Sequence, residues 1–348
     1  MKKMAALLAF AFLYLFVMPD AAFAQRGSGS SQVVEVRLAS PLPRNSDWGR
    51  ALDRIAADWA RVTNNEVRLR IIHDGVEGGE AKMLSSLNAN NIQAGLFVSS
   101  GLYEICPAVM NLSVPFQIKS EEELNLVLND ALPVLNAQIS KTNFAVVAWS
   151  KGGWVNIFSK EPVVTPDDLR RQKLAATAEQ KDLNVAIKSM GFSMVETELI
   201  DVGMKLANNM ISAVYLTPVA VAPLGLHKNL KNMLDLPIAP FMAAIVINRV
   251  TWNKISADRQ RELIRVTQRV ADEFDVVMLR TVDNAVSAMS RDGLKVNRPS
   301  PAQEELWYTE ISKVIPSLIG TTFDRDLYQQ ITRTLEKSRS AAAADAQR

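Results

Sequence analysis

Apolar positions along the chain follow two periodicities in turn, one typical of strands and one typical of helices. Apolar and polar residues alternate over 34–38, which predicts a half-buried strand. After two prolines, Pro41 and Pro43, apolar residues recur every three or four positions over 48–62, which predicts a helix. The alternating pattern returns over 67–71. The chain therefore opens with a strand-helix-strand unit.

The same unit repeats further along the chain. Later strands are expected at 94–98, 145–149, 173–177, 194–196, 213–216 and 243–248, with helices near 83–87, 165–169 and 180–190 between them. This alternation predicts an α/β fold of parallel strands covered by helices. Ligands in open sheets of this kind lie outside the carboxyl ends of the strands. The loops after Leu38, Ile72 and Val98 are therefore the first places where binding residues are expected.

One long helical pattern runs over 256–291 without proline or glycine. At 1.5 Å per residue such a helix would be about 50 Å long, against roughly 30 Å for a small domain. We therefore expect it to bridge two lobes. The alternative is two helices broken near Asp272 and Glu273, but no helix-breaking residue supports it.

Gly152 and Gly153 interrupt the strand pattern and mark either a hinge crossing between lobes or an ordinary turn. Taken with the bridging helix 256–291, this predicts two α/β lobes. Lobe I is expected to comprise 33–150 plus about 240–255, and lobe II 151–239 plus about 292–335.

The two ends differ from the body of the chain. Residues 1–24 have the layout of a secretory signal peptide, with lysines, an apolar run and the small-residue site Ala22-Phe23-Ala24. The apolar run over 4–18 is shorter than the roughly 20 residues of a membrane span, which argues against an uncleaved anchor. We expect cleavage after Ala24 and a mature protein free in the periplasm. The alanine-rich stretch 338–348 predicts a disordered tail.

Composition and motifs argue against several classes of function. The formal charge of +2 and the lack of a basic stripe argue against a nucleic-acid partner. His73 and His227 lack metal-ligand spacing, and Cys106 lies in an apolar context beside Pro107. No nucleophile elbow, phosphate loop or dinucleotide motif is present. The sequence therefore predicts no enzyme activity, no metal and no cofactor.

The order of short motifs resembles a known family. The motifs are His73-Asp74-Gly75, Gly79-Glu80, Met83-Leu84, Val98-Ser99-Ser100-Gly101, Val114-Pro115-Phe116, the stretch from Asn156 to Lys160 and the stretch from Thr165 to Leu169. Together they are similar to the substrate-binding proteins of tripartite ATP-independent periplasmic (TRAP) transporters. The resemblance implies a two-lobed clamshell braced by a long helix. It also implies delivery of a small ligand to a membrane permease driven by an ion gradient.

Three departures from the family pattern concern the ligand. Members usually carry an arginine that grips the ligand carboxylate, and Ala175 occupies that position here. Val155 occupies a second position that is usually basic. The usual Asp-Gly-Gln-Glu-Asn stretch is replaced over 212–216 by Ser-Ala-Val-Tyr-Leu. Because all three changes remove charge or polarity, we expect an apolar or neutral ligand.

The predicted ligand-binding residues come from these motifs and from aromatic positions near them. They are Ser99, Ser100, Tyr103, Trp154, Asn156, Ala175, Thr177, Tyr215, Leu216 and Phe241. Taken singly, each aromatic residue more commonly belongs to the core. One alternative keeps a carboxylate ligand and takes the missing cation from Lys151 or Arg44. Another is a periplasmic carrier or chaperone of hydrophobic or lipid-like molecules that works with a soluble helical-repeat partner.

Overall fold

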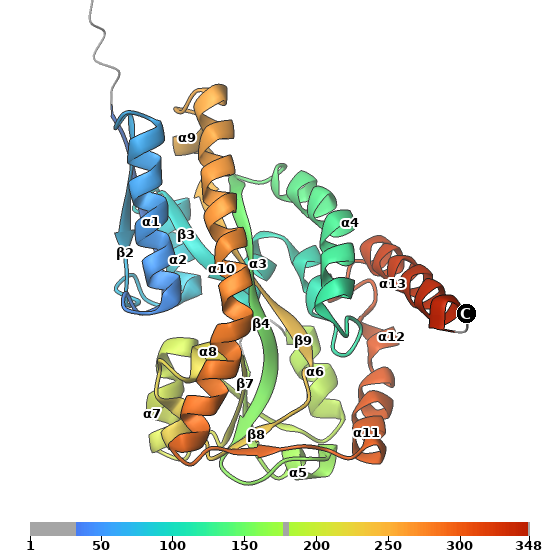
Figure 1. The fold of residues 1–348 in the computed structure, drawn as a ribbon. Helices are drawn as coiled ribbons and strands as arrows, with labels where there is room; N and C mark the ends of the chain where they lie inside the picture. Colours follow the sequence, from blue (N-terminus) through green and yellow to red (C-terminus); the bar gives the residue numbers. More distant parts are fainter. Residues whose placement is uncertain (1–32, 177–180, 347–348) are drawn as a thin grey trace, which may run out of the picture. The chain divides into compact units, whose positions relative to one another are not determined.

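The computed structural model describes residues 33–176 and 181–346, which alternate between strands and helices (Figure 1). The strands are β1 (Val34–Ala39), β2 (Val67–Ile72), β3 (Ala94–Val98), β4 (Phe144–Ser159), β5 (Lys173–Ala176), β6 (Ser193–Glu196), β7 (Ala213–Leu216), β8 (Asn232–Leu234), β9 (Ala239–Asn248) and β10 (Lys295–Asn297). The α-helices are α1 (Asp47–Val62), α2 (Glu80–Asn88), α3 (Ser99–Ile105), α4 (Glu121–Ile139), α5 (Pro166–Arg170), α6 (Lys181–Ser189), α7 (Val202–Ala207), α8 (Pro218–Val221), α9 (Arg249–Trp252), α10 (Ala257–Arg291), α11 (Pro301–Ser312), α12 (Ile315–Leu318) and α13 (Arg325–Ala346). The predicted α/β class is confirmed.

Two groups of parallel strands are joined by two long antiparallel strands. The strand order is β2-β1-β3-β9-β4-β7-β5-β6, with β8 beside β4 and β10 beside β8. β1 pairs in parallel with β2 and β3, and β5 pairs in parallel with β6 and β7. β9 and β4 run antiparallel to each other and to the strands beside them. We call the part around β1–β3 the first half and the part around β5–β7 the second half.

Strand β4 passes without a break from one half to the other. Its register against β9 shifts between Lys151 and Trp154, and Gly153 has a φ of +83°, a conformation that glycine adopts without strain. A Cβ on Gly152 would come within 2.3 Å of the Phe241 ring. The glycine pair is therefore a bulge inside a continuous strand, and the turn interpretation is wrong. A hinge motion at this bulge stays a prediction.

Helix α10 spans Ala257–Arg291, as the hydrophobic spacing predicts, and begins at Ser256, whose side chain caps it. The helix packs along β4 and contacts α1 in the first half and α8 in the second half (Figure 1). A buried hydrogen bond of 2.7 Å from Trp59 Nε1 to Thr267 Oγ1 ties it to α1. One unbroken helix therefore braces both halves, and the two-helix alternative is wrong.

Separate apolar clusters support each half. In the first half, one cluster is centred on Trp59 and Leu38 beneath α1 and α10, and another on Phe97 and Met83 beneath α4. In the second half, one cluster contains Phe158 and Val214, and another contains Leu174, Phe192 and Trp307. Burial of this apolar surface stabilises the fold by roughly 25 cal/mol per Å².

The prediction of a disordered tail over 338–348 is wrong for 338–346, the part of this range that the structure describes. Helix α13 continues to Ala346. Alanine has the highest helix propensity, and Arg339 pairs with Glu123 of α4 at 2.7 Å. The expected signal peptide, 1–24, lies outside the described residues. Within the described ranges, no helix is both long and apolar enough to span a membrane.

Candidate functional site

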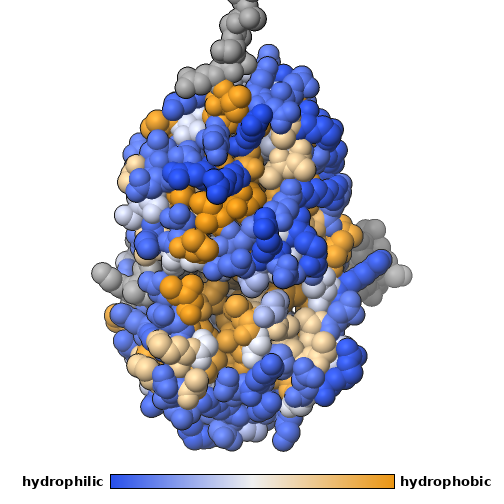
Figure 2. All heavy atoms as spheres, turned by 90° about the vertical axis from the view of Figure 1, so that its left-hand side faces the viewer, coloured by the Kyte–Doolittle hydropathy of each residue, from blue (hydrophilic) through white to orange (hydrophobic). Residues whose placement is uncertain are grey.

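A cavity of about 310 Å³ lies where the first and second halves meet. This volume falls within the range of small-molecule sites. The first half contributes the loop after β1, the start of α2 and the end of β3, through Pro41–Pro43, Gly79–Glu80 and Val98. These are the loops that the sequence pattern singles out. Figure 2 shows hydrophobic surface gathered on the second half near its boundary with the first half.

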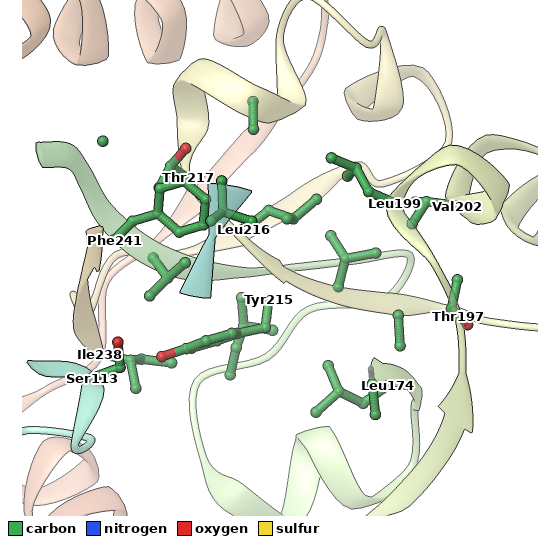
Figure 3. A pocket seen from close by; sticks show the side chains of 18 of the residues that line it. Ser113, Leu174, Thr197, Leu199, Val202, Tyr215, Leu216, Thr217, Ile238 and Phe241 are labelled. Carbon is green, nitrogen blue, oxygen red and sulfur yellow. The ribbon is translucent and has the colours of Figure 1, made fainter. Parts of the chain in front are cut away.

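The second half forms most of the wall with the ends of its strands (Figure 3). β5 contributes Leu174, Ala175 and Ala176, and β7 contributes Val214, Tyr215 and Leu216. Parallel strands end at one edge of a sheet, so their last residues converge on one place. Phe241 of β9 and Gly152 of β4 complete the wall at the bulge.

The lining of this cavity is mainly apolar. Among its described residues there is no lysine, arginine or histidine, and the charged side chains are Glu80 and Glu198. Glu80 accepts hydrogen bonds from the backbone N–H groups of Val98 and Gly101, at 2.5 and 2.8 Å. Glu198 belongs to the loop after β6 and forms no ion pair with any described residue. The described part of the cavity wall therefore carries two carboxylates and no lysine, arginine or histidine.

Tyr215 supplies a hydroxyl group inside this apolar wall. The residue is 36% exposed, and this exposed surface borders the cavity, where the surrounding protein raises the pKa of the phenol by desolvation. The hydroxyl points toward the side of the cavity where Ser113 and Ile238 lie (Figure 3). It forms no hydrogen bond to any described residue. Tyr215 therefore offers a neutral donor and acceptor to a bound molecule.

Thr217 supplies a second hydroxyl group. It lies at the N-terminus of α8 but does not cap that helix with its side chain, although it is only 1% exposed. Its hydroxyl has no hydrogen-bond partner among the described residues, and the residue lines the cavity. A buried polar group without a partner is costly unless a ligand or water satisfies it. Thr217 is therefore a second candidate contact for a polar group of the ligand.

The structure brings four predicted site residues together on the cavity wall: Ala175, Tyr215, Leu216 and Phe241. Val155, the other position where the family carries a basic residue, also lines the cavity. Both positions therefore present aliphatic side chains, which cannot grip a carboxylate.

Three other predicted residues lie outside the described lining. Trp154 and Asn156 flank Val155 on β4, and successive side chains in a strand point to opposite faces. Trp154 Nε1 donates to Glu121 Oε1 at 3.0 Å, and Asn156 Nδ2 donates to the carbonyl of Leu234 at 3.1 Å. Tyr103 packs against a different apolar cluster.

The three remaining predicted residues are Ser99, Ser100 and Thr177. Ser99 and Ser100 are the first residues of α3, and only their backbone is described. Thr177 lies outside the described residues. A ligand-binding role for these three residues stays a prediction.

The two alternative cations are both paired elsewhere. Lys151 Nζ lies 3.1 Å from Glu121 Oε2 and donates to Asn125 at the same distance. Arg44 Nε lies 3.6 Å from Asp53 Oδ2. Neither residue is part of the cavity wall. A relocated cation would therefore have to leave its present partner to reach a ligand.

Five residues of the wall were missed by sequence reasoning. We call this part of the wall the inner arm and define it by these five residues of one apolar cluster in the second half: Leu174, Ile187, Met190, Phe192 and Trp307. Their spacing, such as that of Ile187 and Met190, is that of ordinary core residues. Only the packing shows that they border an open space.

Among the described residues, the chain's histidine and cysteine side chains lie away from this cavity. His73 Nε2 lies 2.9 Å from Asp53, and the buried Cys106 thiol, whose pKa is raised by desolvation, donates to Gln138 at 3.3 Å. Neither residue lines the cavity. Across 33–176 and 181–346, no group of three or more potential ligand residues could hold a metal ion.

Known proteins share both the sequence pattern and the fold. The family model for bacterial extracellular solute-binding protein, family 7 (DctP), matches residues 38–320. A solute-binding protein of Chromohalobacter salexigens is 22% identical over 255 residues, which are 72% of this chain and 74% of that protein.

Two solved structures show the same two-lobed architecture. A TRAP periplasmic solute-binding protein of Haemophilus influenzae RdAW with bound L-gulonate has a TM-score of 0.79 at 17% identity, covering 86% of this chain and 99% of that one. One of Ralstonia eutropha H16 with bound (S)-2-acetolactate has a TM-score of 0.80 at 15% identity, covering 87% and 99%. This chain belongs to the bacterial extracellular solute-binding protein family 7, the substrate-binding proteins of TRAP transporters.

Proposed function

We propose that this protein is a periplasmic receptor for an uncharged, mainly apolar solute, which it delivers to a TRAP-type membrane permease. The observation that carries the proposal is the lack of any cationic side chain in the described cavity lining, together with the carboxylates of Glu80 and Glu198. The related structures hold acids such as L-gulonate and succinate. An enclosed carboxylate without a cation carries a desolvation penalty of several kcal/mol. Those acids therefore suit this cavity poorly.

The apolar wall also fits a second role, as a carrier of hydrophobic molecules that works with a soluble partner. Both roles need the same cavity and differ only in the recipient of the ligand. A permease gene next to the gene for this protein would favour the receptor. A neighbouring gene for a helical-repeat protein would favour the carrier.

Calorimetry with matched ligands tests the proposed ligand class. We expect hexan-1-ol to bind more tightly than hexanoate, which has the same chain length but carries a negative charge. We expect no measurable binding of succinate or D-glucuronate, because the wall offers no cation to either. Tight binding of either acid, with hexan-1-ol inactive, would show that the cavity recognises carboxylates.

A further inference from the structure

We propose that the cavity takes a single-chain amphiphile, with an extended apolar tail in the inner arm and an uncharged polar head beside Tyr215. This inference rests on the proposed function and specifies its ligand class. The cavity wall borders three apolar clusters. Trp48 packs against the cluster in the first half, Leu216 packs against one cluster in the second half, and Trp307 belongs to the other.

The inner arm suits a tail because it offers almost only carbon atoms. It lies between β5, α6 and α11, and the one polar group among its five side chains is the indole N–H of Trp307. That N–H already donates to the carbonyl of Val164 at 3.0 Å. The inner arm therefore leaves no unpaired donor or acceptor for a polar ligand group, whereas an alkyl chain needs none.

Hydroxyl groups mark the other part of the cavity. The hydroxyls of Tyr215 and Thr217 have no hydrogen-bond partner among the described residues, and Ser113 also lines the cavity. These groups can donate to and accept from an alcohol or amide head. Glu198, which forms no ion pair with any described residue, disfavours a carboxylate head. The cavity thus offers hydroxyl groups at Tyr215 and Thr217 together with the apolar side chains of the inner arm, as an amphiphile requires.

The volume of the whole cavity sets the scale of the ligand. About 310 Å³ is roughly twice the ~150 Å³ of an apolar cavity that admits benzene. A chain of about ten carbon atoms matches that space. Chain length is therefore the property that distinguishes this inference from a site for compact neutral molecules.

Helix α6 offers a matched pair of variants. Ile187 lies on the inner arm, whereas Val185 of the same helix is 66% exposed and does not border the cavity. Ile187→Trp fills the inner arm, and Val185→Trp adds the same side chain to the solvent side. The pair separates loss of the tail site from a general effect of tryptophan on this helix.

The experiment is calorimetric titration of the full chain with a series of primary alcohols from hexan-1-ol to decan-1-ol. Each added methylene should tighten binding about fourfold, which gives roughly 200-fold across the series. Ile187→Trp should abolish this gain while hexan-1-ol still binds, and Val185→Trp should keep the wild-type series. Thermal unfolding confirms that both variants fold.

The outcomes separate the inference from the proposed function. Equal affinity for hexan-1-ol and decan-1-ol in the wild type would overturn the tail site and leave the neutral receptor intact. The same conclusion would follow if Ile187→Trp folded and kept the full chain-length gain. Failure of every alcohol, with succinate or D-glucuronate binding instead, would refute the proposed function itself. If Ile187→Trp did not fold, the wild-type series would still decide the question.

Discussion

At the scale of single residues, two positions of the cavity wall bear on the proposed ligand class. Ala175 and Val155 occupy positions where a basic residue is expected from the family pattern, and the structure places both on the wall. A charge-assisted hydrogen bond contributes about 1.5 to 3 kcal/mol, so the loss of an arginine fork at Ala175 is large on the scale of binding. Tyr215 restores hydrogen-bonding capacity without restoring charge.

Ala175→Arg should shift the ligand preference of the cavity from neutral molecules toward carboxylic acids. The guanidinium would face the cavity from β5 and offer two donors to a carboxylate. One charge-assisted hydrogen bond corresponds to at least about a tenfold gain in affinity. We expect succinate binding to rise by this factor or more in calorimetry, and binding of hexan-1-ol to fall.

Ser193→Arg is the control for this change. Ser193 lies on the neighbouring strand β6, is exposed and does not line the cavity. It should leave both affinities unchanged. A folded Ala175→Arg variant that gained no affinity for acids would contradict the role given to position 175.

At the scale of elements, hydrogen bonds join α10 to the part of β4 immediately before the glycine bulge. Asp275 Oδ1 accepts hydrogen bonds from Ser150 Oγ at 2.7 Å and from the Lys151 N–H at 3.0 Å. Gln268 exchanges two hydrogen bonds of 3.0 Å with the backbone of Trp149. These hydrogen bonds therefore fix α10 and β4 relative to each other beside the predicted hinge.

Asp275 should make stability depend on pH. Desolvation, its main cause, and the charge of Asp272 raise the pKa of Asp275 from 3.8 to about 7, although hydrogen bonds from Ser150 and Lys151 oppose the rise. Between pH 4 and pH 7 the folded protein therefore keeps a proton that the unfolded chain releases. This carboxyl lowers stability as pH rises through that range, by at most about 4 kcal/mol.

Asp275→Asn should remove this pH dependence, because the amide oxygen can still accept both hydrogen bonds and never ionises. We expect the variant to be more stable than the wild type at pH 8 and similar to it at pH 4, as measured by urea unfolding. Asp283→Asn, at an exposed site on the same helix, should change neither value. A variant less stable at pH 8 would show that the charged form of Asp275 is the one the fold prefers.

The sequence predicts elements better than it predicts side-chain directions. Helix α10 follows from the helical spacing of its apolar residues and from the lack of internal proline and glycine. The β1-α1-β2 unit follows from the switch between strand and helix periodicity of its apolar residues. The short strands β8 and β10, with three residues each, carry too little pattern to be predicted. Trp154 was placed in the pocket as an aromatic residue near Gly153, but its direction depends on a register shift that only the packing with β9 reveals.

At the scale of the whole molecule, the two halves touch across the cavity. A Cβ on Gly79, at the start of α2, would come within 1.9 Å of Glu198 Oε2 from the second half. Gly75 also lies near the second half, because a Cβ there would be in van der Waals contact with Ile200, at 3.7 Å. A ligand that contacts both halves stabilises the arrangement in which they meet. Coupling of ligand binding to the position of the halves is therefore a prediction of this arrangement.

The small molecule that co-purifies with the protein tests the central claim most directly. Mass spectrometry of the protein under native conditions, followed by analysis of the extracted ligand, gives its stoichiometry and identity. The account predicts one uncharged molecule per chain with an extended apolar part. A dicarboxylate or a sugar acid in the cavity would contradict it.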